Sequence, residues 1–93
     1  MELLWTSSFT RAYKRLARRN AGIHAKISDT LEQLASDPFH PRLRTHKLTG
    51  ELESVWACSV DYDFRVLFEF VKNPETGADE LLLLTMGTHD EVY

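Results

Sequence analysis

Cysteine is nearly absent from this sequence: Cys58 is the only one among 93 residues, which excludes an internal disulfide. No residues around it have the spacing of a zinc site. Long hydrophobic runs are absent as well, because the longest, residues 81–84, is far shorter than the roughly 20 apolar residues that cross a bilayer. The start of the chain has no basic region or export-type cleavage site, so no signal peptide is expected. We therefore expect a reduced, cytoplasmic protein that does not act at a membrane.

Glycine and proline are also scarce, with four and three copies, which excludes collagen-like and low-complexity chains. The 43% of hydrophobic and 27% of charged residues are ordinary proportions for a soluble globular domain. A chain of 93 residues has room for one small hydrophobic core. We expect a single domain that spans residues 1–93.

The net charge of −3 hides a strong asymmetry along the chain. Residues 1–50 hold nine Lys and Arg against four Asp and Glu, a net charge of +5, whereas residues 51–93 hold two against ten, a net charge of −8. Such a chain can present a basic face to a polyanion despite its acidic isoelectric point. The alternative is that the basic residues only form the solvated side of a helix.

Hydrophobic periodicity predicts an α+β fold with the element order β-α-α-β-β-β. Residues 2–6 are typical of a strand, and Ser7 or Ser8 after it is a candidate helix N-cap. Apolar stripes over 9–17 and 23–34 predict two helices, which their short link should pack as an antiparallel hairpin.

The second half of the sequence is typical of strands. Aromatic or β-branched residues recur at every second position over 62–70, as Tyr62, Phe64, Val66, Phe68 and Phe70. Residues 80–86 are apolar at every position but the first and the sixth, which favours a central strand. The predicted strands are 52–60, 62–70 and 80–86, joined by turns at 61–62 and 73–77. We expect the helical hairpin to pack on one face of a mostly antiparallel sheet.

Four polar residues stand out as candidates for chemistry. Strand alternation places Asp63 and Arg65 together, on the face opposite the aromatic residues. This pair could simply neutralise itself at the surface, or it could place a proton acceptor beside a phosphate-binding guanidinium. His46, just before the sheet, and His89, after the last strand, could join the pair if the strands form a meander. One imidazole could then accept a proton while the other donates one.

These features together resemble the RelE/ParE superfamily of bacterial toxins, and in particular its YafQ-type branch. The resemblance covers the whole chain, and H-x-L-x-G at 46–50 and G-T-H at 87–89 are its most specific motifs. It implies the toxin of a type II toxin–antitoxin system, a ribosome-dependent mRNA endonuclease (mRNA interferase). It also implies that the partners are a cognate antitoxin, the ribosome and translated mRNA, with no metal and no small-molecule cofactor.

Within this resemblance, His46, Asp63 and His89 match catalytic positions of the YafQ pattern, and Arg65 matches the strand arginine of RelE-like members. Ser59 and Thr85 depart from the pattern, because YafQ-like proteins have a histidine and an arginine there. Phe64 and Tyr93 match aromatic positions of the pattern and would stack on bases. The basic stripe of the first helix, together with the loop after the second helix, would bind RNA. The predicted RNA-binding residues are Arg11, Lys14, Arg15, Arg18, Arg42, Arg44, Phe64 and Tyr93.

The implied chemistry is metal-free cleavage, in which the 2′-hydroxyl of RNA attacks the adjacent phosphorus. Asp63 or His46 would act as the base and His89 as the acid, while Arg65 would stabilise the phosphorane. Two alternatives stay open. One is a ParE-type toxin that binds DNA gyrase without cleaving anything, and the other is a decayed toxin that only titrates an antitoxin.

Overall fold

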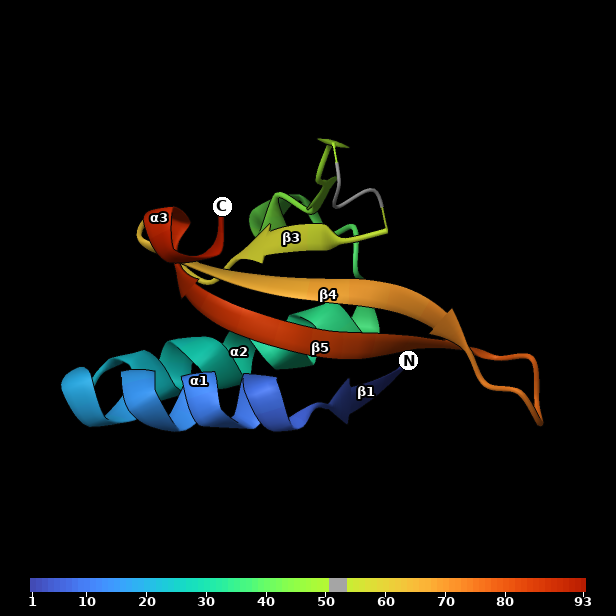
Figure 1. Cartoon of the computed structure of the whole chain (residues 1–93), viewed down its shortest axis with the longest axis horizontal. Coiled ribbons are helices and arrows are strands. Elements are labelled where there is room, and N and C mark those ends of the chain that lie inside the picture. The colour runs from blue at the N-terminus through green and yellow to red at the C-terminus, as the bar shows by residue number, and fades with distance from the viewer. Residues whose placement is uncertain (51–53) are drawn as a thin grey trace.

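The computed structural model describes residues 1–50 and 54–93 (Figure 1). Within these residues, a sheet of five strands in the order β1-β5-β4-β3-β2 carries α1 and α2 on one face. The elements are β1 (Glu2–Trp5), α1 (Ser7–Arg19), α2 (Ile23–Ser36), η1 (Pro41–Leu43), β2 (His46–Lys47), β3 (Trp56–Ser59), β4 (Phe64–Lys72), β5 (Asp79–Thr88) and α3 (His89–Val92). The predicted α+β order and the helical hairpin on one face are confirmed.

The sheet is antiparallel except at one edge, where β1 pairs with β5 in parallel. β5 lies between β1 and β4, as its apolar sequence predicts. Three short elements, η1, β2 and α3, were not predicted from the sequence, because each is too short to show hydrophobic periodicity. Leu52, which was assigned to a predicted strand, lies outside the described residues.

α1 begins one residue earlier than its sequence suggests. Thr6 is the N-cap: its hydroxyl oxygen accepts a hydrogen bond from the Phe9 N–H at 3.1 Å and donates one to the Leu83 carbonyl at 2.7 Å. The prediction that Ser7 or Ser8 caps α1 is therefore wrong, since both lie inside the helix. Thr6 is the cap because it directly follows β1, and the pairing of β1 with β5 already holds its backbone beside β5.

The main core lies between the sheet and the helical hairpin. Apolar residues three or four positions apart give each helix one buried stripe, and alternate residues of the strands complete the layer. Fully buried members include Phe9, Ile23, Ile27, Leu34, Val66, Phe68, Leu81, Leu83 and Met86. Each such aliphatic or aromatic side chain contributes about 1.5–3 kcal/mol of transfer free energy when it leaves water.

A register shift in β5 places Met86, and not Thr85, on the helix side with Leu81 and Leu83. Leu67 pairs with Thr85, but the next residue, Phe68, pairs with Leu83, so Leu84 is an extra residue in the ladder. The bulge reverses the alternation, and Leu84 joins a second apolar cluster on the open face. That cluster is built on Val55, Ala57 and Leu67, with Leu48, Leu84 and Val92 packed against it.

α3 covers part of this open face by packing directly over β5. Gly87 makes the close approach possible, because a Cβ at that position would lie 3.2 Å from Glu91 Cβ and 3.2 Å from Val92 Cγ1. Figure 1 shows α3 at one end of the sheet, on the side away from α1. Among the described residues, no helix has the length and apolar character that would span a membrane.

Replacing Thr6 by alanine should lower the free energy of unfolding by about 1–2 kcal/mol, because an N-cap bond and a bond to β5 are lost together. Ser8→Ala is the matched control and should change stability little, since Ser8 is exposed inside the first turn. Urea denaturation of the two variants measures both values. An equal loss in the two variants would contradict the assignment of Thr6 as the cap.

Candidate active site

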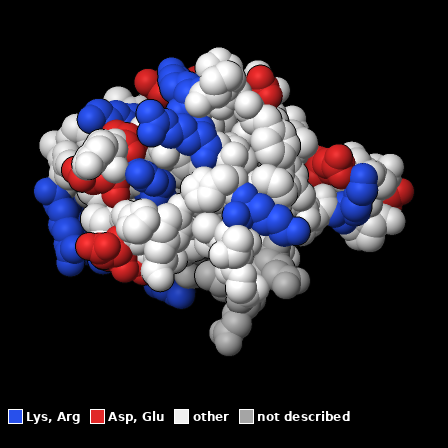
Figure 2. All heavy atoms as spheres, turned by 90° about the horizontal axis from the view of Figure 1, so that it is seen from above, with Lys and Arg blue, Asp and Glu red and all other residues white. Residues whose placement is uncertain are grey.

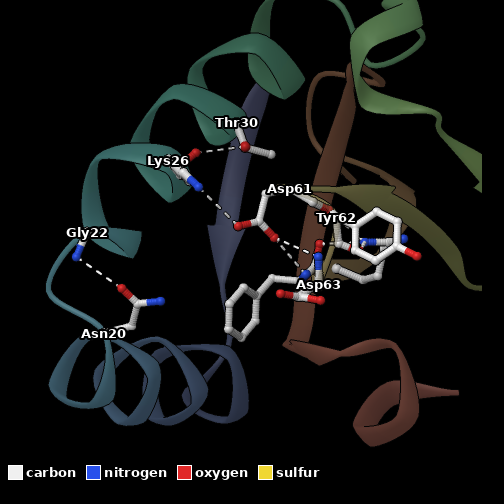
Figure 3. A network of polar contacts seen from close by, with 9 residues as sticks. Asn20, Gly22, Lys26, Thr30, Asp61, Tyr62 and Asp63 are labelled. Carbon is white, nitrogen blue, oxygen red and sulfur yellow. Dashed lines mark hydrogen bonds and ion pairs between the residues drawn. The ribbon is translucent and has the colours of Figure 1, made fainter.

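The connection between β3 and β4 is organised by the side chain of Asp61. Its Oδ1 accepts the backbone N–H groups of Asp63 and Phe64, both at 2.9 Å, and its Oδ2 lies 3.3 Å from Lys26 Nζ on α2 (Figure 3). The Val60 N–H also donates to the Phe64 carbonyl at 2.9 Å, which closes the turn. One carboxylate thus fixes the connection and ties it to the helical layer.

The same contacts set the protonation state of Asp61. Partial burial of the carboxyl opposes ionisation, but the N–H groups of Phe64 and Asp63 and the ammonium of Lys26 outweigh it. They hold the pKa of Asp61 below its ordinary value. The group is therefore ionised at neutral pH, as an acceptor of these three donors must be.

Arg65 is anchored to the same connection through one end of its guanidinium. Nη1 donates to the carbonyl oxygens of Asp61 at 2.8 Å, Tyr62 at 3.0 Å and Phe64 at 3.0 Å. Because Nη1 carries only part of the guanidinium donors, the N–H groups on Nη2 and Nε are left for other acceptors. The cross-strand partners of Arg65 are Ser59 and Gly87, which are small and leave room around it.

His46 lies in β2, paired with Ala57, rather than in the loop before the sheet. Its Nδ1 is 3.0 Å from the carbonyl oxygen of Arg44, and its Nε2 is 3.1 Å from the hydroxyl of Tyr93. A carbonyl can only accept, so Nδ1 carries the proton of the neutral ring. Nε2 therefore presents a lone pair and accepts the Tyr93 O–H.

Tyr93 connects the two predicted histidines. Its ring packs edge-on against His89, with centroids 4.3 Å apart, and against His46, with centroids 6.2 Å apart. Burial raises the pKa of the Tyr93 phenol, and the nearby Arg65 guanidinium opposes this shift only in part. The phenol therefore stays protonated at neutral pH and can donate to His46.

His89 is positioned by the start of α3. Thr88 is the N-cap and forms a capping box with Glu91, whose backbone N–H and carboxylate lie 3.3 and 2.9 Å from their Thr88 partners. The hydrogen bonds from Thr88 lower the pKa of Glu91, so its carboxylate is maintained as a cap. The backbone N–H of His89 donates to the Asp63 carbonyl at 3.2 Å and so joins α3 to the β3–β4 connection.

A hollow of about 530 Å³ lies beside these groups. Asp63, Arg65 and His89 line it together, with Tyr62, Thr88 and Asp90 completing the wall. His46 does not line this hollow and reaches the group through Tyr93. In the described part of the chain no ion pair joins Asp63 to Arg65, whose Nη1 is bound to carbonyl groups instead. The structure thus brings the four predicted residues to one end of the sheet.

Of the two aromatic residues nearest to Asp63, one lies where strand alternation predicts and the other does not. Phe64 packs against the main core, on the helix side of the sheet, so it does not share the face of Arg65. This position does not favour a contact of Phe64 with RNA bases, and that role stays a prediction. Tyr62, which strand alternation assigned to the helix side, is 91% exposed and lines the hollow, because it lies before β4 begins and period two does not apply to it.

The two residues that depart from the YafQ pattern lie close to Arg65 in the sheet. Ser59 is the direct partner of Arg65 in β3, and Thr85 pairs with Leu67 in β5. Leu67 and Arg65 are two apart on β4, so Thr85 and Arg65 share the open face. A guanidinium is therefore present on this face even though position 85 lacks one.

The basic residues among the predicted RNA contacts lie in two separate groups, the first of which also includes Arg19. Arg11, Lys14, Arg15, Arg18 and Arg19 line one hollow of about 400 Å³ on α1. Arg42 and Arg44 line another of about 360 Å³ that also contains Arg65. Figure 2 shows the face with β3 and α3, on which basic side chains gather in several places with acidic side chains among them. No cluster of three or more His, Cys, Asp or Glu able to hold a metal ion occurs within the described residues.

Solved structures with the same arrangement are bacterial toxins. The YoeB/ParE toxin from Agrobacterium tumefaciens has a TM-score of 0.76 at 21% identity, covering 96% of this chain and 99% of that one. YafQ from E. coli strain BL21(DE3) has a TM-score of 0.78 at 15% identity, covering 99% and 97%. YafQ in the E. coli DinJ–YafQ complex has a TM-score of 0.76 at 15% identity, with the same coverage. At these identities the likeness establishes the fold alone.

The family follows from the sequence itself. The model of a family described as bacterial toxin of type II toxin-antitoxin system, YafQ, matches residues 1–93. The chain belongs to this YafQ toxin family, which confirms the resemblance in the motifs at 46–50 and 87–89. A comparison with curated proteins gave no match.

Replacing Asp61 by alanine should lower the free energy of unfolding by about 1–3 kcal/mol, because two backbone N–H groups lose a charged acceptor. Lys26→Met is the matched control: it removes only the exposed ion pair and should cost less than about 1 kcal/mol. Urea denaturation at pH 7 measures both. A larger loss for Lys26→Met than for Asp61→Ala would contradict the role of the carboxylate as a turn organiser.

The pH dependence provides an independent check on the same residue. A carboxyl whose pKa is lowered by folding adds stability that is fully present above its unfolded pKa. That stability is lost as the pH falls through the lowered folded pKa. The difference in stability between the parent and Asp61→Asn should therefore shrink on acidification.

Proposed function

We propose that this YafQ-family toxin is a ribosome-dependent endoribonuclease that cleaves translated mRNA without a metal ion. The observation that supports this proposal is the contact of Tyr93 with both His46 and His89, beside a hollow that contains Asp63 and Arg65. A toxin that acts only by binding has no need for two imidazoles at one site. This reasoning disfavours the alternative of a gyrase-binding toxin.

Cleavage of RNA at this site would use the 2′-hydroxyl as the nucleophile. Its oxygen attacks the adjacent phosphorus, its proton passes to a base, and the bond to the 5′-oxygen breaks as that oxygen takes a proton from an acid. The products are a 2′,3′-cyclic phosphate and a free 5′-hydroxyl. DNA lacks the attacking hydroxyl, so the activity is confined to RNA.

The base would be His46 or Asp63. Nε2 of His46 carries the lone pair, because the Arg44 carbonyl holds the proton on Nδ1. An imidazole suits general-base catalysis at neutral pH better than a carboxylate does. To reach the 2′-hydroxyl, however, Nε2 must exchange the Tyr93 hydroxyl for the substrate. Asp63 needs no such exchange, since it lines the hollow with Arg65 and His89.

The remaining roles fall to Arg65 and His89. The Nη2 and Nε donors of Arg65 would bind the non-bridging oxygens as charge builds up on the phosphorane. Anchoring of Nη1 holds the guanidinium in place before the substrate arrives. His89, exposed on α3 at the wall of the same hollow, would protonate the leaving 5′-oxygen.

The partners proposed are a cognate antitoxin and the ribosome. The DinJ–YafQ complex of E. coli is the precedent for an antitoxin partner. The hollow lined by five basic residues on α1 is the proposed contact to ribosomal RNA, because clustered Lys and Arg bind phosphates and release counterions. Arg42 and Arg44 lie in another hollow, with Arg65.

His89→Ala or Asp63→Ala should abolish growth arrest while leaving the fold intact, since both side chains are exposed. Loss of a positioned acid or base should slow mRNA cleavage about 10²–10⁴-fold. Primer extension on translated mRNA measures cleavage, and circular dichroism checks the fold. His24→Ala is the matched control, because His24 is exposed on α2 away from the hollow and should act like the parent.

If both variants arrest growth like the parent, the assignment of these residues is wrong. A parent that induces a DNA-damage response without cutting mRNA would support the gyrase-binding alternative instead. A parent with no toxicity would support a decayed toxin, as the substitutions at Ser59 and Thr85 would then imply.

Neutralising the basic residues of α1 should weaken ribosome binding in a salt-dependent way. Each phosphate contact removed among Arg11, Lys14, Arg15 and Arg18 should reduce the slope of log affinity against log salt by roughly 0.7–0.9. Sedimentation with ribosomes at several salt concentrations measures the slope. Lys72→Gln is the control, because Lys72 is paired with Asp79 at 2.6 Å in another hairpin. Ribosome binding that does not depend on salt would exclude this surface.

A further inference from the structure

Tyr62 is an exposed aromatic side chain on a fixed backbone. Its side chain is 91% exposed, more than that of any other large hydrophobic residue reported for the described chain. Its carbonyl oxygen accepts a hydrogen bond from Arg65 Nη1 at 3.0 Å, and the neighbouring Asp61 carboxylate holds the next N–H groups of the turn (Figure 3). The ring therefore projects into solvent from a turn whose backbone is held in place.

The ring stands between two hollows. One, of about 530 Å³, contains Asp63 and His89, and the other, of about 360 Å³, contains Arg42 and Arg44. Tyr62 and Arg65 line both. A chain of nucleotides with its reacting phosphate at Arg65 would thus have Tyr62 next to it, whichever way it continued.

The other candidate aromatic residues are less available to a base. Phe64 packs against the main core, and Tyr93 is 46% exposed and held between His46 and His89. Tyr62 has no such packing, so its ring face is open to a ligand. Planar bases stack on such faces with little regard to base identity.

We propose that Tyr62 stacks on a nucleobase of the RNA strand next to the scissile phosphate, and that the strand continues into the second hollow. Arg42 and Arg44 there contact a neighbouring phosphate. This inference rests on the proposed RNA cleavage, and it assigns the ligand of the second hollow as single-stranded RNA of the substrate. Stacking fixes the orientation of the strand, while Arg65 fixes its phosphate.

The test is binding of a short single-stranded oligoribonucleotide by the purified full chain, measured by fluorescence anisotropy. A 2′-deoxy nucleotide at the mapped cleavage position prevents reaction. Tyr62→Ala should weaken binding about 5–100-fold, in line with the loss of one base–aromatic stack. Tyr62→Phe keeps the ring and should bind like the parent.

A second oligonucleotide identifies the stacked base. It carries an abasic nucleotide beside the cleavage position, and with it Tyr62→Ala and the parent should bind equally. Arg42→Ala is the matched control: it should weaken binding of both oligonucleotides alike and flatten the salt dependence, whereas Tyr62→Ala should leave the salt dependence unchanged.

The outcomes separate this inference from the proposed function. Equal binding by Tyr62→Ala and the parent, or no binding by the parent, overturns the inference even if the parent cuts translated mRNA. A base-dependent loss in Tyr62→Ala supports it. If the parent cuts no mRNA but Tyr62→Ala still weakens binding of an unmodified oligoribonucleotide, the nuclease proposal fails, and only a contact of Tyr62 with bound RNA is supported.

Discussion

The carboxylate of Asp61 is the interaction on which the site depends. It holds two backbone N–H groups of the β3–β4 connection, and through Lys26 it reaches the helical layer on the other side of the sheet. The carbonyl oxygen of the same residue anchors Arg65. The positions of the β3–β4 connection and of the Arg65 guanidinium are therefore set by folding, before any ligand binds. Groups fixed in advance in this way lose little free energy to reorganisation when charge develops.

The open face of the sheet becomes a site because β5 is irregular. The bulge at Leu84 returns Met86 to the helix side and leaves Thr85 on the open face, and Gly87 lets α3 lie close above the strand. α3 then carries His89 at its first residue and directs the chain so that Tyr93 meets His46 from β2. Tyr93 and His46, which are 47 positions apart in the sequence, are thus joined by a hydrogen bond.

The amphipathic patterns of the chain predicted most of the fold, because the two helices and the long strands each bury one side. The patterns failed where neighbouring residues of the same type could take one role. Thr6, and not Ser7, caps α1, because it directly follows the strand whose pairing sets the backbone there. The placement of His46 and His89 at the same end of the sheet could be predicted only on the assumption that the strands form a meander. The hydrogen bond between Tyr93 and His46 could not be predicted, because contacts between distant side chains leave no periodic pattern in the sequence. The exposure of Tyr62 was missed because this residue precedes β4 and does not follow the alternation of the strand.

The parallel pairing of β1 with β5 has a consequence for the timing of folding. Thr6 bonds to a residue 77 positions away, so neither α1 nor β1 can reach its final place before β5 has been synthesised. Contacts of such long range slow folding, because loop closure must precede them. A nascent chain on the ribosome thus contains the basic helix long before it contains β5 and α3. The candidate site needs His89 and Tyr93 from this late part of the chain, so it is completed after the basic helix has formed.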